Sequence, residues 1–221
     1  MGKLIVIEGL DGSGKGTQSR RLTEYLGSQG HDAARIDFPR YGTKGATLVE
    51  GYLKGELGSD PDQTGAYATS LFFAMDRYWS YRTQWKELHE SQNGVLVFDR
   101  YTTANAVHQC AKLPRDQWDT FLDWLWDVEY NKIGIPAPDS IIFLDMKPSI
   151  VRKLIDSRSE KESRAKDIHE LDMTYLERCY EAALYACHRL GWKHVLCFEG
   201  EEPRPMDDIF SDILKALEGV I

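Results

Sequence analysis

The sequence predicts an α/β fold, a doubly wound five-stranded parallel sheet with helices on both faces. Five short runs rich in Val, Ile, Leu and Phe recur along the chain, segments with helical spacing separate them, and the first run leads into a glycine-rich turn. Near-continuous apolar strands are typical of parallel sheets that are covered on both faces. Strands that alternate with helices require right-handed crossover connections, which give this class of fold.

The predicted elements follow one another from the N-terminus to the C-terminus. Strands are predicted at residues 4–8, 33–38, 94–98, 140–145 and 194–198. Helices are predicted at residues 19–26, 64–91, 115–131, 149–155, 172–190 and 206–217. Because no repeat, low-complexity tract or linker interrupts this alternation, we expect one domain over residues 1–221, with a short lid segment at about 156–170.

Composition and charge indicate a globular protein and argue against several classes of partner and location. The chain has 221 residues, of which 42% are hydrophobic, enough for one sizeable core. Its 27 Lys and Arg against 35 Asp and Glu give a net charge of -8, which argues against a nucleic acid as partner. The four cysteines are scattered, so we expect reduced thiols. Without a signal peptide or a run of about 18 apolar residues, we expect a cytoplasmic protein with no membrane partner.

The glycine-rich turn after the first strand is the most informative segment. It follows the buried run 4–7 and precedes an amphipathic stretch, which is the setting of a phosphate-binding loop. Glycines lack a Cβ, so the backbone can fold its N–H groups around an anion, while Lys15 adds a mobile cation at a partly positive helix N-terminus. We predict that a nucleoside polyphosphate is bound by Gly9, Leu10, Asp11, Gly12, Ser13, Gly14, Lys15, Gly16 and Thr17.

Charged residues also follow the next two strands, at the edge where open parallel sheets bind their ligands. Asp99 and Arg100 come directly after the third strand. A carboxylate there suits Mg²⁺ or its water shell, and a guanidinium suits phosphate oxygens. A structural pair that closes the strand end is the alternative. Arg40 follows the second strand, although a lone arginine is usually a solvated surface residue.

Two helical segments carry weaker signals. Phe73 and Arg77 are four residues apart and share a helix face, where a ring could stack on a base and a guanidinium could bond its edge. More often such an aromatic is part of the core. The charged stretch 158–170 holds Arg158 and Arg164 among acidic residues. It is either an exposed helix with ion pairs or a lid that brings an arginine to a transferring phosphoryl group.

Taken together, these motifs resemble the thymidylate kinases, of the nucleoside monophosphate kinase group of P-loop kinases. The resemblance runs from about residue 3 to residue 217. Its specific parts are the segment 8–15, Phe-Pro-Arg at 38–40, Phe-Ala-Met-Asp-Arg at 73–77, Asp-Arg-Tyr at 99–101 and Pro-Asp at 138–139.

The resemblance implies transfer of the γ-phosphoryl group of ATP to dTMP, giving dTDP and ADP with Mg²⁺, on the route to dTTP. It implies that Lys15 and the loop amides hold the ATP phosphates and that Asp11 orients the nucleotide near the acceptor phosphate. It also implies that Arg40 and Arg100 grip that phosphate, with Asp99 in the metal's shell. Phe73 would stack on thymine, Arg77 would bond the base edge, and Asn105 would assist from a following helix. A homodimer is a further possibility.

This sequence departs from the family pattern at several positions. Gly16 replaces the usual Ser or Thr metal ligand, so metal coordination is expected to run more through water. His108 stands where many members have an aromatic wall near the deoxyribose. Gly12 occupies the slot of an arginine that some members carry in the loop, so the lid is expected to supply that cation, with Arg164 the first candidate and Arg158 the second.

Two other functions stay open on the sequence alone. One is a kinase for another monophosphate or a deoxynucleoside. The other is a nucleotide-binding switch that hydrolyses its nucleotide slowly. The several arginines expected on the acceptor side of the site argue against a switch.

Overall fold

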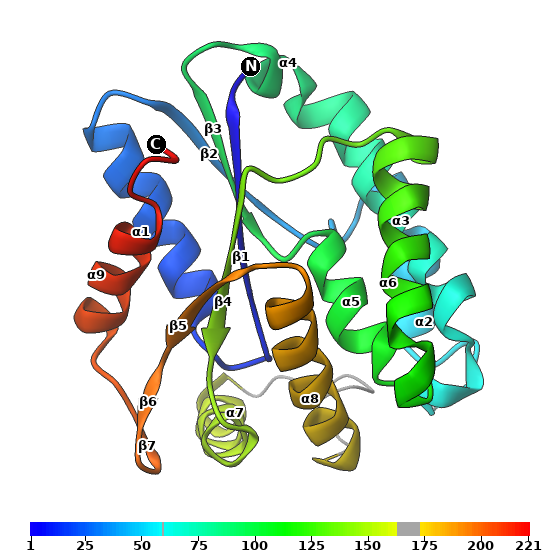
Figure 1. Cartoon of the computed structure of the whole chain (residues 1–221). Coiled ribbons are helices and arrows are strands. Elements are labelled where there is room, and N and C mark those ends of the chain that lie inside the picture. The colour runs from blue at the N-terminus through cyan, green and yellow to red at the C-terminus, as the bar shows by residue number, and fades with distance from the viewer. Residues whose placement is uncertain (59, 163–172) are drawn as a thin grey trace.

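The computed structural model describes residues 1–58, 60–162 and 173–221. Its centre is a five-stranded sheet in the order β2-β3-β1-β4-β5, in which every pairing is parallel (Figure 1). The strands are β1 (Lys3–Gly9), β2 (Asp32–Asp37), β3 (Gly94–Asp99), β4 (Ser140–Asp145) and β5 (Lys193–Leu196). The predicted fold class and the parallel five-stranded sheet are confirmed.

The predicted strands lie within one or two residues of the observed ones, and the largest difference is at the last. There the strand was expected to run to residue 198 but ends at Leu196. The chain then turns at Gly200, so that Phe198–Glu199 (β6) pairs with Glu202–Pro203 (β7) as a short antiparallel ribbon. Phe198 therefore belongs to this ribbon and not to the main sheet.

The helices connect the strands in the order that the alternating pattern predicts. They are α1 (Lys15–Ser28), α2 (Thr47–Leu53), α3 (Ala66–Ser80), α4 (Lys86–Glu90), α5 (Thr102–Cys110), α6 (Trp118–Trp126), α7 (Pro148–Glu162), α8 (Met173–Arg189) and α9 (Met206–Ala216).

Several helical regions differ from the prediction. Helix α5 was not predicted from helical spacing and was expected only from the family resemblance, and α7 continues past residue 155 to Glu162. The predicted helix 64–91 is α3 and α4 joined by the π-helical segment Tyr81–Trp85. The predicted helix 115–131 is α6 extended by the π-helical segment Asp127–Ile133. Helix α2 was not predicted, because it is short and buries only Val49 and Tyr52, too few residues to establish a periodicity.

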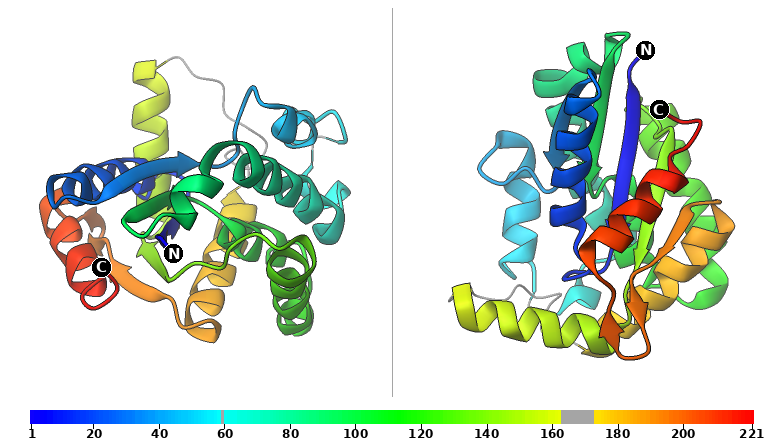
Figure 2. Two further views of the ribbon diagram at one scale, coloured as in Figure 1. Left: turned by 90° about the horizontal axis from the view of Figure 1, so that it is seen from above. Right: turned by 90° about the vertical axis from the view of Figure 1, so that its left-hand side faces the viewer.

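Helices cover both faces of the sheet. Helices α1 and α9 lie side by side on one face, while α4, α5 and α8 lie on the other (Figures 1 and 2). Successive residues of β1 serve the two faces in turn: Ile5 and Ile7 belong to one buried cluster, and Leu4 and Val6 to another. This double coverage explains why the central strands β1, β3 and β4 are largely apolar, whereas the edge strands β2 and β5 are only partly buried and carry charged residues.

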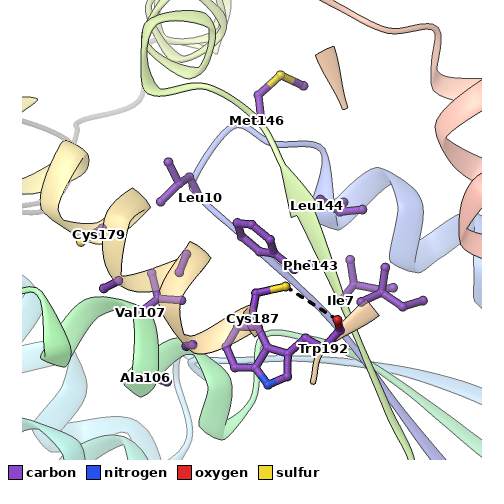
Figure 3. Packing of buried hydrophobic residues seen from close by; sticks show 14 of the residues in the cluster. Ile7, Leu10, Ala106, Val107, Phe143, Leu144, Met146, Cys179, Cys187 and Trp192 are labelled. Carbon is purple, nitrogen blue, oxygen red and sulfur yellow. Dashed lines mark hydrogen bonds between the residues drawn. The ribbon is translucent and has the colours of Figure 1, made fainter. Parts of the chain in front are cut away.

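The larger buried cluster reaches up to the glycine-rich turn. Phe143 of β4 packs with Val107 of α5 and Cys187 of α8, and the Cys187 thiol donates a hydrogen bond to the carbonyl oxygen of Trp192 at 3.7 Å (Figure 3). Leu10, from the turn itself, is 1% exposed and belongs to the same cluster. Full burial of a leucine side chain contributes about 1.5–3 kcal/mol. The hydrophobic core therefore anchors the turn.

All four cysteines are buried, unpaired thiols. Within the described ranges, no helix has the combination of length and apolar character that a crossing of the bilayer requires.

Candidate active site

The carboxyl ends of β1, β2 and β3 meet at one edge of the sheet. Asp99 at the end of β3 is in register with both Ile7 of β1 and Asp37 of β2, so the segments that follow these strands start close together. A cavity opens beside them, with about 510 Å³ of empty space including its open mouth. Its wall includes most of the predicted acceptor-side residues, namely Asp11, Phe73, Arg77, Arg100, Asn105 and His108.

The glycine-rich turn has the backbone that a phosphate-binding loop needs. Gly14 precedes α1 with φ +94°, in the left-handed region that favours glycine. A Cβ at Gly9 would come within 2.8 Å of the carbonyl oxygen of Leu144, so β4 and the loop can approach only with glycine there. The hydroxyl of Ser13 is buried and has no hydrogen-bond partner among the described residues.

Lys15 extends back over this loop. Its ammonium group donates to the carbonyl oxygen of Leu10 at 2.7 Å and lies 3.8 Å from Asp11 Oδ1. The side chain is 6% exposed, and burial, together with the nearby positive charge of Arg100, lowers the pKa of Lys15. A phosphate placed in the loop would add further negative charge beside this cation, in addition to that of Asp11.

Arg100 and Asp11 form an ion pair across the same edge. Arg100 Nη2 bonds to Asp11 Oδ1, and Arg100 is the one non-glycine residue with a positive φ (+68°) in the ranges that the structure covers. Burial raises the pKa of Asp11, but the positive charges of Arg100 and Lys15 outweigh it and hold that pKa well below its usual range. Burial would lower the pKa of Arg100, and Asp11 raises it. Both groups are therefore charged.

Arg77 lies deeper in the wall and is paired with an acid that the sequence analysis missed. Its Nε and Nη2 donate to the two carboxylate oxygens of Glu129 at 2.7 and 2.5 Å, and Nη1 donates to the carbonyl oxygen of Tyr101 at 3.3 Å. Glu129 comes from the π-helical segment Asp127–Ile133 and is fully buried. Nothing in its local sequence distinguishes it from the exposed acids nearby, so only the three-dimensional contact reveals it.

Phe73, Asn105 and His108 complete the wall from two helices. Phe73 of α3 meets the ring of Tyr52 edge-on, with centroids 6.2 Å apart. Asn105 of α5 donates through Nδ2 to the carbonyl oxygen of Ser70 at 3.2 Å and to Glu129. His108, also of α5, lies with Nδ1 3.5 Å from the sulfur of Cys179. The predicted aromatic, amide and imidazole groups thus lie around one cavity.

Arg40 is oriented differently. Its Nη1 donates to Asp37 at 2.7 Å and its Nε donates to Gln84 at 3.1 Å. It is not among the residues that line the cavity with Arg100. The negative charge of Asp37, three residues earlier at the end of β2, accounts for this orientation.

Asp99 is paired with an arginine that the sequence analysis did not consider. Arg35, on β2, donates to Asp99 Oδ2 at 2.7 Å and to the hydroxyl of Ser19 on α1 at 2.8 Å. This is the structural pairing at a strand end, but with Arg35 in place of the neighbouring Arg100. A Cβ at Gly16 would lie 3.3 Å from Asp99 Oδ2, so this carboxylate is next to the phosphate-binding loop. The described residues contain no cluster of three or more His, Cys, Asp or Glu that could hold a metal.

The predicted lid lies largely outside the described residues. Arg164 is outside them, and Arg158 falls within α7, but its side chain is not among those described. The earlier part of α7 contacts the phosphate-binding loop, since a Cβ at Gly12 would lie 3.2 Å from Ile155 Cγ1 and 3.4 Å from the carbonyl oxygen of Val151. The helix that precedes the predicted lid begins at Pro148, after β4, and therefore packs against the loop in its first two turns.

Comparison with known proteins gives a consistent result. The family model for thymidylate kinase matches residues 7–194. The thymidylate kinase of Mycobacterium tuberculosis H37Rv is 30% identical over 185 residues, covering 83% of this chain and 84% of that protein. The human thymidylate kinase is 35% identical over 147 residues, 66% of this chain and 62% of its own. A solved structure of thymidylate kinase from Candida albicans superimposes with a TM-score of 0.69 at 22% identity, covering 98% of this chain and 91% of that one, and so shares the fold. The chain belongs to the thymidylate kinase family.

Proposed function

We propose that the protein transfers the γ-phosphoryl group of ATP to the phosphate of dTMP. An oxygen of the dTMP phosphate attacks the γ-phosphorus, the bond from that phosphorus to the β–γ bridging oxygen breaks, and ADP and dTDP result. The observation that supports this best is the cavity that joins the phosphate-binding loop, through Asp11 and Arg100, to a wall of aromatic and hydrogen-bonding groups. It offers two nucleotides adjoining sites with positive charge between them.

The loop residues 9–17 are proposed to hold the ATP phosphates. The glycines turn backbone N–H groups toward an anion, and the buried Lys15 ammonium adds a full positive charge. Phosphoryl transfer requires alignment and positive charge around the moving group more than covalent help from the protein. A lysine held against the loop by a 2.7 Å hydrogen bond supplies both.

The acceptor nucleotide is proposed to occupy the cavity. Phe73 would stack on the base, Arg77 and Asn105 would bond its edge, and His108 would lie beside the sugar. Arg100 would bind the acceptor phosphate, with Asp11 orienting the guanidinium. Arg40 would join the phosphate only after leaving Asp37 and Gln84, so we assign it a smaller part.

Magnesium is the proposed cofactor, with Asp99 as the residue that would hold its water shell. One oxygen of this carboxylate bonds to Arg35, which leaves Oδ1 to accept a hydrogen bond from a metal-bound water. Gly16 has no hydroxyl to offer, so the residues present fit a metal held mainly through water. When bound, the ion neutralises charge on the β- and γ-phosphate oxygens.

A lid arginine, Arg164 first and Arg158 second, is proposed to complete the positive charge around the transferred group. The contact of α7 with Gly12 supports this, because a helix that packs against the loop can bring the residues that follow it near the same phosphates.

The test of the reaction is turnover of dTMP, dUMP, dCMP, dGMP and AMP with ATP and Mg²⁺, followed as ADP release. We expect dTMP to be the preferred acceptor, with purine nucleotides turned over poorly. Strong preference for a purine would contradict the base-site assignment. Nucleotide binding without acceptor-dependent ADP release would point to a switch protein instead.

We also propose that the protein acts in the cytoplasm as a homodimer. Four buried, unpaired thiols suit a reducing compartment. Leu71, Met75 and Trp79 recur every four residues along α3 and remain 41–42% exposed, an apolar stripe that a second copy could cover.

A double substitution, Leu71→Glu with Met75→Glu, tests the dimer. Two buried carboxylates per protomer would oppose association, so we expect sedimentation to show a dimer for the wild type and a monomer for the variant. Leu196→Glu, at a similar exposure of 43% outside this stripe, is the control and should stay dimeric. A wild-type monomer at micromolar concentration would contradict the dimer proposal.

A further inference from the structure

Among the described residues outside the phosphate-binding loop, Glu129 is the buried carboxylate with the most hydrogen bonds. It is 0% exposed and accepts four hydrogen bonds: two from Arg77, one from the hydroxyl of Thr102 at 2.9 Å and one from Asn105 Nδ2 at 3.3 Å. A buried charge is costly unless it is paired and fully hydrogen-bonded. Here the pairing involves two residues of the cavity wall, Arg77 and Asn105.

The carboxylate fixes which N–H groups of Arg77 remain for a ligand. The side-on pair with Glu129 uses Nε and one N–H of Nη2, and Tyr101 takes one N–H of Nη1. A guanidinium has five N–H bonds, so one is left on each terminal nitrogen. Arg77 therefore presents donors only.

The same carboxylate fixes the orientation of Asn105. Its amide nitrogen faces two acceptors, the carbonyl oxygen of Ser70 and Oε1 of Glu129, so the NH₂ group must point at them. The amide oxygen Oδ1 is then the group that remains. Asn105 therefore presents an acceptor beside the donors of Arg77.

We propose that Glu129 is a positioning residue that sets this donor–acceptor polarity and thereby selects a pyrimidine with a carbonyl next to an N–H. This inference rests on the proposed function, since it assigns the base of the acceptor nucleotide to this wall. Thymine and uracil carry O4 next to N3–H, which matches Arg77 and Oδ1 of Asn105. Cytosine carries an amino group next to an unprotonated N3. Its amino donor would face the N–H donors of Arg77, and its N3 acceptor would face the acceptor Oδ1 of Asn105.

The variant Glu129→Gln tests the role directly. An amide keeps the volume but turns one acceptor into a donor, which must face Arg77, Thr102 or Asn105, so the wall loses its fixed polarity. We expect kcat/KM for dTMP to fall about 10- to 100-fold, mainly through KM, from the loss of a charged hydrogen-bond set. The preference for dTMP over dCMP should fall at least tenfold, and the KM for ATP should change less than about twofold, because the phosphate-binding loop is untouched.

Asp127→Asn is the matched control. It makes the same change from acid to amide in the same π-helical segment, at a side chain that is 48% exposed and is paired with Lys132 and Asn131. This variant should keep both the rate and the preference for dTMP. A folded Glu129→Gln enzyme with an unchanged ratio of dTMP to dCMP turnover would overturn the proposal. So would an equal loss for dTMP, dCMP and ATP, which indicates general structural damage.

Ligand analogues test the same polarity in the wild-type enzyme, in case the variant does not fold. N3-methyl-dTMP keeps O4 but lacks the N–H, and dUMP keeps the whole edge. We expect dUMP to bind much more tightly than N3-methyl-dTMP or dCMP, by at least tenfold in competition with dTMP. Equal binding of all three would overturn the proposal even if dTMP is turned over. Absence of dTMP turnover altogether would instead contradict the proposed reaction.

Discussion

Alanine at Lys15 is expected to lower kcat at least about 100-fold without unfolding the protein. The ammonium is the buried cation of the phosphate-binding loop, and removal of one preorganised electrostatic group from a reacting centre typically costs about 2.7–4 kcal/mol of barrier. Its bond to the Leu10 carbonyl oxygen keeps it in place before the nucleotide arrives. Steady-state turnover of dTMP with saturating ATP measures the effect, and a thermal melt checks the fold.

Lys54→Ala is the control for this experiment. Lys54 is 65% exposed and its ion-pair partner among the described residues is Glu50, so its loss should leave turnover unchanged. A Lys15→Ala enzyme that works at a near wild-type rate would show that the loop does not use this cation for catalysis.

Alanine at Arg100 is expected to have the second largest effect, a loss of about 100- to 1000-fold in kcat/KM for dTMP. Two consequences add together. The acceptor phosphate loses its guanidinium, and the Asp11 carboxylate, which keeps Lys15 nearby but loses its ion pair with Arg100, repels the incoming phosphate. The pKa of Asp11 should rise, because the largest lowering influence on it is removed. The measurement is kcat/KM for dTMP and for ATP separately, with the larger loss expected for dTMP.

The matched control is Arg189→Ala, an exposed arginine of α8 that pairs with Asp119 and Asp123. It should not change either constant. Equal losses for dTMP and ATP in Arg100→Ala would place this guanidinium on the donor phosphates and would contradict its assignment to the acceptor.

Much of the fold was predictable because the central strands β1, β3 and β4 are buried on both faces and read as apolar runs. The loop that follows β1 was predictable from its glycines and one lysine. The unpredicted α2 shows the limit of periodicity, since two buried residues in a short helix leave no pattern.

Side-chain pairing in the site was harder to predict than its location. Arg35 and Arg40 lie on either side of the end of β2, and the sequence does not say which of them turns toward the loop. Strand alternation and the bond to Ser19 bring Arg35 to Asp99, whereas Arg40 turns to Asp37. Glu129 was not predictable at all, since its partner Arg77 is 52 residues away along the chain.

Because Leu10 is inserted into the core, substitutions far from the phosphate-binding loop should affect nucleotide binding. A loop held down by a leucine side chain has its anion-binding shape before any nucleotide is present, so binding need not freeze a disordered segment. The reverse also holds. Substitutions that loosen the packing around Phe143 or Val107 would make the conformation of the phosphate-binding loop less well defined. The affinity of the protein for the phosphate donor should therefore fall when core residues distant from the loop pack less tightly.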